Sequence, residues 1–115
     1  METLYNKMGE FIKMDELLPA DEFFAYYKDL IAYLQEKYQD ENQENLIKLK
    51  GICAIVYQNA FARAKMDIKN RNKFRKIGEK CQFWANAIEL RLVKEGLSAE
   101  VQEQMEQKLW DRDAE

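Results

Sequence analysis

Apolar residues recur at helical spacing along nearly the whole chain. A first helix is predicted over about residues 2–14, where one face carries apolar side chains at i, i+4, i+7 and i+8: Leu4, Met8, Phe11 and Ile12. Asp15 to Leu18 interrupt this pattern. Pro19 suits the first position of a second helix, since the N–H that proline lacks would be unpaired there. This second helix is expected to run to about Gln39.

The polar run Gln39 to Glu44 predicts a loop, and Asn42 suits the N-cap of a third helix. That helix carries apolar residues on two sides, so we expect it to lie centrally between two neighbours. No glycine or proline marks its end near Asp67. One alternative is a continuous helix over about residues 43–95. We favour a break, because a continuous rod would leave too few partners for its two apolar faces unless the protein oligomerises.

A fourth helix, capped by Asp67 or Asn70, has a core stripe of Phe74, Ile77, Cys81, Trp84, Ile88 and Leu92. Trp84 lies at the centre of this stripe and is expected to be mostly buried. Gly96 suits the left-handed residue that ends a helix, and Ser98 suits the cap of a short last helix.

Together these patterns predict an all-α chain. We expect a single domain over residues 1–115, a compact bundle of about five helices. The two long central helices should form an antiparallel hairpin that turns near Asp67. In that register Cys53 and Cys81 stand at the same level across the helix pair.

The composition removes most catalytic chemistry. The chain has no histidine, one serine (Ser98) and one threonine (Thr3). The usual general base is therefore missing, and a hydroxyl nucleophile with a positioned base is close to excluded. Two cysteines are too few for a zinc site, and four scattered glycines form no phosphate-binding loop. We expect no enzyme, no metal and no cofactor.

Other features favour a cytoplasmic protein that does not enter a membrane. The longest apolar run, Ile52 to Tyr57, is far too short for a membrane span. The first residues, Met1 to Leu4, lack the pattern of a signal peptide. In that compartment the two cysteines are expected to be reduced thiols.

The charge is unevenly distributed. The eighteen residues from Arg63 to Lys80 hold eight of the eighteen basic residues and carry +6, whereas the remainder carries −9. Six of these bases form the candidate binding face: Lys69, Lys73, Lys76 and Lys80 along one flank of the fourth helix, and Arg71 and Arg75 on the opposite flank.

Three interpretations of the basic face remain open. The face could pair with acids of the second and last helices, bind an acidic protein partner, or track nucleic-acid phosphates. The net charge of −3 and the pI near 5.2 disfavour nucleic acid. We also expect no aromatic ring on the exposed basic face.

A second apolar stripe, Phe83, Ala87 and Leu90, lies roughly opposite the core stripe. Burial under another helix is the favoured interpretation, and an exposed interface is the alternative. Tyr26 and Tyr33 flank the core stripe of the second helix, where they could serve as binding anchors.

Without a catalytic residue set, the sequence favours a small helical protein that acts by protein–protein binding, as an adaptor, regulator or inhibitor. The alternative is an accessory nucleic-acid-binding protein that uses residues 63–80. Self-association is also compatible with the pattern, and the sequence does not name the partner.

Overall fold

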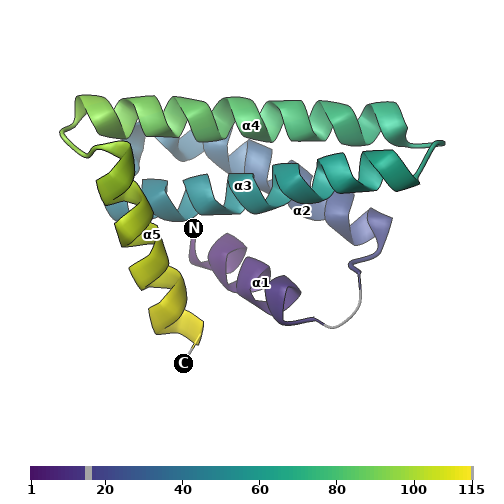
Figure 1. Ribbon diagram of the computed structural model, residues 1–115, viewed down its shortest axis with the longest axis horizontal. Coiled ribbons are helices and arrows are strands. Elements are labelled where there is room, and N and C mark those ends of the chain that lie inside the picture. Colours follow the sequence, from purple (N-terminus) through teal and green to yellow (C-terminus); the bar gives the residue numbers. More distant parts are fainter. Residues whose placement is uncertain (15–16, 115) are drawn as a thin grey trace. The chain divides into compact units, whose positions relative to one another are not determined.

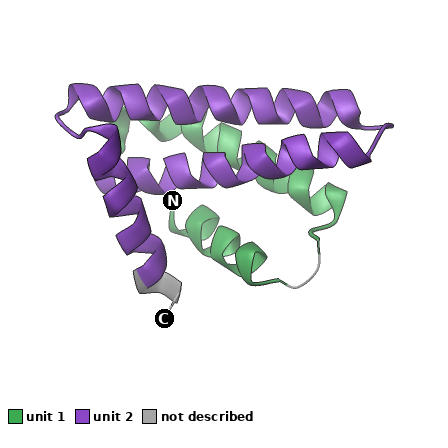
Figure 2. Cartoon of the chain, viewed as in Figure 1, with its two compact units in different colours: residues 1–42 green, residues 43–115 purple. Residues whose placement is uncertain are grey.

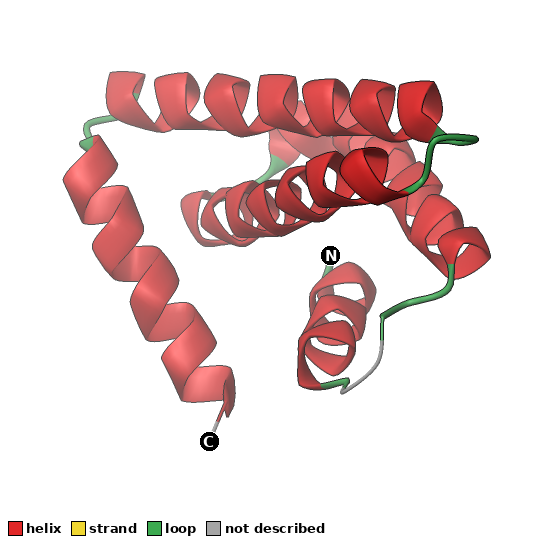
Figure 3. Ribbon diagram, turned by 45° about the vertical axis from the view of Figure 1, so that its right-hand side comes forward, coloured by secondary structure: helices red, strands yellow, loops and turns green. Residues whose placement is uncertain are grey.

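The computed structural model describes residues 1–14 and 17–114, and every regular element in these ranges is helical (Figure 3). The all-α prediction is therefore confirmed. The elements are α1 (Glu2–Lys13), α2 (Ala20–Lys37), the short 3-10 helix η1 (Tyr38–Asp40), α3 (Gln43–Met66), α4 (Arg71–Lys94) and α5 (Ala99–Ala114). Asp15 and Glu16, in the predicted interruption, lie outside the described residues.

The chain divides into two compact units, residues 1–42 and residues 43–115 (Figure 2). The expectation of a single domain stays a prediction.

In the first unit, α1 is tied to α2 by Tyr26. Its hydroxyl donates a hydrogen bond of 2.7 Å to the carbonyl oxygen of Leu4. Its ring meets the ring of Phe11 edge-on, with centroids 5.3 Å apart. Pro19 is the N-cap of α2, so the helix begins at Ala20, one residue later than predicted. η1 occupies the start of the segment that the sequence assigned to a loop.

In the second unit, α3 and α4 form an antiparallel hairpin, and the alternative of one continuous helix is wrong (Figure 1). The turn is closed by Asp67, whose carboxylate accepts hydrogen bonds from the side-chain amide of Asn70 at 2.9 Å and its backbone N–H at 3.1 Å. These bonds lower the pKa of Asp67. An aspartate that binds the backbone three residues ahead stabilises a turn without glycine or proline.

The register of the hairpin follows the prediction. The thiol of Cys53 on α3 is hydrogen-bonded to that of Cys81 on α4, and both are buried. Toward the turn, Arg71 contacts Ala64, and at the far end Lys50 contacts Glu89. Residue numbers on α4 therefore increase as the numbers of their partners on α3 decrease, as antiparallel helices require.

The core stripe of α4 differs from the prediction at one position. Five of its six predicted residues are buried: Phe74, Ile77, Cys81, Ile88 and Leu92. Trp84 is mostly buried, with its Nε1 atom inaccessible to solvent, and Ala85 is buried as well. At 3.6 residues per turn, positions 84 and 85 lie equally far from the line through Cys81 and Ile88, one on each side of it. The expectation of a mostly buried Trp84 is therefore confirmed.

The end of α4 is capped as predicted. Gly96 has a φ of 99°, and the N–H of Leu97 donates to the carbonyl of Leu92 at 2.9 Å. Ser98 Oγ then accepts a 3.3 Å hydrogen bond from the N–H of Val101 in the first turn of α5. In Figure 1, α5 turns away at this end of the hairpin, the end opposite the α3–α4 turn.

Candidate binding surfaces on the hairpin of α3 and α4

The predicted lysine line is largely present. Lys73, Lys76 and Lys80 lie on α4 and are exposed. Lys69 is exposed as well, but it lies in the turn because α4 begins only at Arg71. The inclusion of Lys69 in a helical line is therefore wrong, since the Asp67 turn precedes the helix.

The lysines and the second apolar stripe belong to one line along α4, which we call the outer stripe. Its residues follow alternating steps of three and four: Lys73, Lys76, Lys80, Phe83, Ala87, Leu90 and Lys94. All are exposed except Ala87, which is half-buried. The outer stripe is basic in its first half and apolar in its second, and it ends on a lysine. Along the sequence these two halves look like separate features.

The apolar half is not covered. The side chains of Phe83 and Leu90 are 61% and 62% exposed, so the favoured interpretation of burial under another helix is wrong. The Nζ atom of Lys80 lies 5.9 Å from the centroid of the Phe83 ring. An open cavity of about 350 Å³ is lined by Lys76, Glu79, Lys80 and Phe83. An aromatic ring does therefore adjoin the exposed lysines, contrary to expectation.

The arginines occupy the other flank of α4 and form a second surface. Arg71 and Arg75 line a cavity of about 480 Å³ together with Phe61, Ala64 and Lys65 of α3. We call this cavity the arginine pocket. The Nε–H of Arg71 donates a 2.9 Å hydrogen bond to the carbonyl oxygen of Ala64, which fixes the guanidinium against the end of α3.

The ring of Phe61 is held in place from the side of α4. A Cβ atom at Gly78 would lie 2.6 Å from this ring, so only glycine leaves room for it. The neighbouring Arg63 places its guanidinium carbon 6.0 Å from the centroid of the Phe74 ring. Burial lowers the pKa of Arg63. Sequence spacing gave no signal for these contacts between helices.

Neutralisation of the basic face within the second unit is limited. Among the described residues, no ion pair is found at Lys76, Lys80 or Arg75. The acids of α5 were candidates for such pairing, but α5 joins the hairpin at the end away from the α3–α4 turn (Figure 1).

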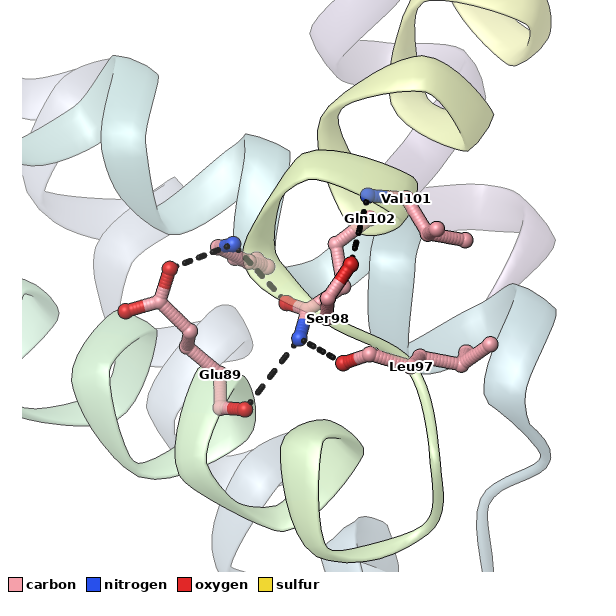
Figure 4. Close-up of polar contacts among 6 residues, drawn as sticks. Glu89, Leu97, Ser98, Val101 and Gln102 are labelled. Carbon is pink, nitrogen blue, oxygen red and sulfur yellow. Dashed lines mark hydrogen bonds and ion pairs between the residues drawn. The ribbon is translucent and has the colours of Figure 1, made fainter.

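At that far end, a polar junction connects α3, α4 and α5. Gln102 is only 1% exposed, and its Nε2 donates to the carbonyl oxygens of Leu97 at 2.9 Å and Glu89 at 3.2 Å (Figure 4). Its Oε1 accepts a 2.9 Å hydrogen bond from Lys50 Nζ, which also lies 3.3 Å from the Glu89 carboxylate. This junction positions α5 against the hairpin.

α5 also crosses α3 closely at Gly51. A Cβ atom at position 51 would lie 2.5 Å from Oε1 of Glu106 and 3.1 Å from Nε1 of Trp110. Burial raises the pKa of the Glu106 carboxyl, while the charge of Lys50 and a hydrogen bond with Trp110 oppose that shift.

The two tyrosines proposed as anchors serve contacts within the first unit. Tyr26 is buried and bound to Leu4, so we leave it out of the candidate surfaces. Tyr33 is half-buried, and its hydroxyl donates to the carboxylate of Glu41. Burial and this hydrogen bond raise the pKa of Tyr33 to about 12.

Within residues 1–14 and 17–114, no group of three or more acidic or cysteine side chains is arranged to hold a metal ion. In the same part of the chain, none of the helices has the length and apolar character needed to cross a bilayer.

Comparison of the chain with protein-family models, with curated proteins and with solved structures gives no match. Its function is therefore argued from the geometry of these surfaces.

Proposed function

We propose that this protein acts by binding another protein through the outer stripe of α4, as an adaptor, regulator or inhibitor in the cytoplasm, without catalysis. The observation that supports this most directly is the continuity of the stripe. Its spacing of three and four residues is the spacing by which one helix packs along another. Two large apolar side chains on it, Phe83 and Leu90, are more than half exposed.

The charges of the stripe indicate the kind of partner. Lys73, Lys76 and Lys80 precede the apolar half, and Lys94 follows it. A partner helix that carries carboxylates around a short apolar stripe complements this arrangement. Such complementarity raises the association rate and selects against basic partners. A second copy docked in parallel by the same stripe would oppose lysine to lysine.

The cysteines support the cytoplasmic part of the proposal. Cys53 and Cys81 face one another and are both free thiols, as is usual in a reducing compartment.

The test is affinity capture from the native host with the wild type and the double variant Phe83→Ser, Leu90→Ser. Val93→Ser is the matched control, because Val93 is also exposed on α4 but lies off the stripe. A partner held by the wild type and by the control, and lost with the double variant, supports the proposal. If the double variant captures the same proteins as the wild type, the proposal is wrong.

Accessory nucleic-acid binding is a second candidate, because the exposed ring of Phe83 adjoins the exposed lysines Lys76 and Lys80. Bases stack on aromatic rings while basic side chains bind the phosphates. In this case DNA or RNA retention falls steeply between about 50 and 200 mM salt. Changing Lys69, Lys73, Lys76 and Lys80 to glutamate should abolish retention and preserve helicity. Absence of retention at low salt contradicts this function.

A further inference from the structure

The arginine pocket lies on the flank of α4 opposite the lysines and is independent of the outer stripe. It is built from one helical turn on each side of the hairpin. Phe61, Ala64 and Lys65 share one face of α3, and Arg71 and Arg75 are four residues apart on α4. Three cationic side chains thus surround one aromatic ring in a cavity of about 480 Å³.

Among the residues that the structure describes, no carboxylate lines this pocket. Asp67 is the only acid from Arg63 to Gly78, and its carboxylate is hydrogen-bonded to Asn70. A pocket with three positive charges suits a dianion better than a single carboxylate. Phosphate monoesters carry about −1.5 to −2 charge at pH 7, and arginine guanidinium groups match their oxygens in paired hydrogen bonds.

Two parts of the pocket are fixed before any ligand binds. Arg71 is held by its Nε–H bond to Ala64, so its terminal N–H groups need little further ordering. Phe61 is held by the close approach of its ring to Gly78. A fixed ring beside fixed charge offers an apolar contact in addition to the anion contacts.

We propose that the arginine pocket binds a small organic phosphate, with the phosphate group at Arg71, Arg75 and Lys65 and a planar or apolar group against Phe61. The volume lies within the usual range of small-molecule sites, about 300–1,000 Å³. The class of ligand is a phosphate monoester such as a nucleoside monophosphate.

The experiment is a titration of the full chain with AMP, with adenosine and with inorganic phosphate, followed by calorimetry and by amide chemical shifts. AMP should bind saturably, inorganic phosphate more weakly and adenosine not at all. Shift changes should centre on residues 61–75. An equal response to adenosine, or no saturable response to AMP, overturns the proposal.

Arg75→Gln is the decisive variant, because Arg75 is exposed and its replacement leaves the core intact. It should weaken AMP binding about tenfold or more, as expected for a lost charged pair. Lys80→Gln is the matched control, with the same charge change on the other flank of the same helix. If Lys80→Gln weakens AMP binding as much as Arg75→Gln does, AMP is attracted only by the overall positive charge of the helix. The arginine pocket is then not a specific binding site.

Discussion

The ring of Phe61 on α3 lies against Gly78 on α4, so close that a Cβ atom at position 78 would stand 2.6 Å from ring carbon Cε1. This contact sets how closely the two long helices approach between the Asp67 turn and the cysteine pair. It also fixes the ring that forms one wall of the arginine pocket.

Gly78→Ala should therefore destabilise the protein. Alanine favours a helix interior over glycine by about 1 kcal/mol, but the added methyl group must displace the partly buried ring of Phe61, and such overpacking costs about 1–3 kcal/mol. We expect a net loss of about 1 kcal/mol or more in urea unfolding. The control is Gly9→Ala in α1, where a Cβ atom meets nothing within 4 Å and the helix should gain stability. If both alanine variants gain the same stability, the close contact between Phe61 and Gly78 is contradicted.

Gln102→Leu should detach α5 from the hairpin. The leucine has similar size, but it leaves the carbonyl of Leu97 and the ammonium of Lys50 without the partner that Gln102 supplies. Loss of a buried polar partner costs about 1–3 kcal/mol. The control is Gln104→Leu, at an exposed position of the same helix. Its free energy of unfolding should stay within about 0.5 kcal/mol of the wild-type value. Amide hydrogen exchange in α5 should rise only in the Gln102 variant.

Glu106 should make the docking of α5 depend on pH. Burial raises the pKa of this carboxyl in the folded state above its unfolded value, so the folded state holds the proton more tightly. The ionised form is therefore unfavourable for folding above the folded pKa, and this penalty disappears as the pH falls through it.

Glu106→Gln removes the ionised form, so this variant should be more stable than the wild type near neutral pH. The difference should shrink as the pH falls toward the unfolded value. The difference in stability is measured from the urea unfolding midpoints of both proteins across this pH range. A direct NMR titration of the Glu106 carboxyl carbon should give a pKa above the usual value, and a lowered pKa there would refute the prediction.

Cys53 and Cys81 should resist thiol reagents in the folded protein. Both side chains are buried, and the hydrogen bond with Cys81, followed by burial, raises the pKa of Cys53 well above its usual value. Little reactive thiolate is present at Cys53 as a result, and burial shields Cys81 from the reagent. Both thiols should react with a colorimetric disulfide reagent only after unfolding in urea. Rapid reaction of either thiol in the native protein would show that the hairpin opens there.

Several features were predictable because they depend on local spacing. The 3.6-residue period located the helices, Gly96 and Ser98 marked the passage from α4 to α5, and the core stripes set the hairpin register that brings Cys53 to Cys81. The stripe missed Ala85, because the spacing allows either of two neighbouring positions and packing buries Ala85 as well as most of Trp84.

The sequence by itself determined the all-α class, the break near Asp67 and the assignment of lysines and arginines to opposite flanks of α4, because periodicity and turn chemistry act over a few residues. Only the tertiary structure decided that Phe83 and Leu90 are exposed, that Phe61 lies on Gly78, and that Gln102 joins three helices. These outcomes depend on which faces of separate helices meet. That is settled by the fit of side chains distant in sequence, and no local pattern records it.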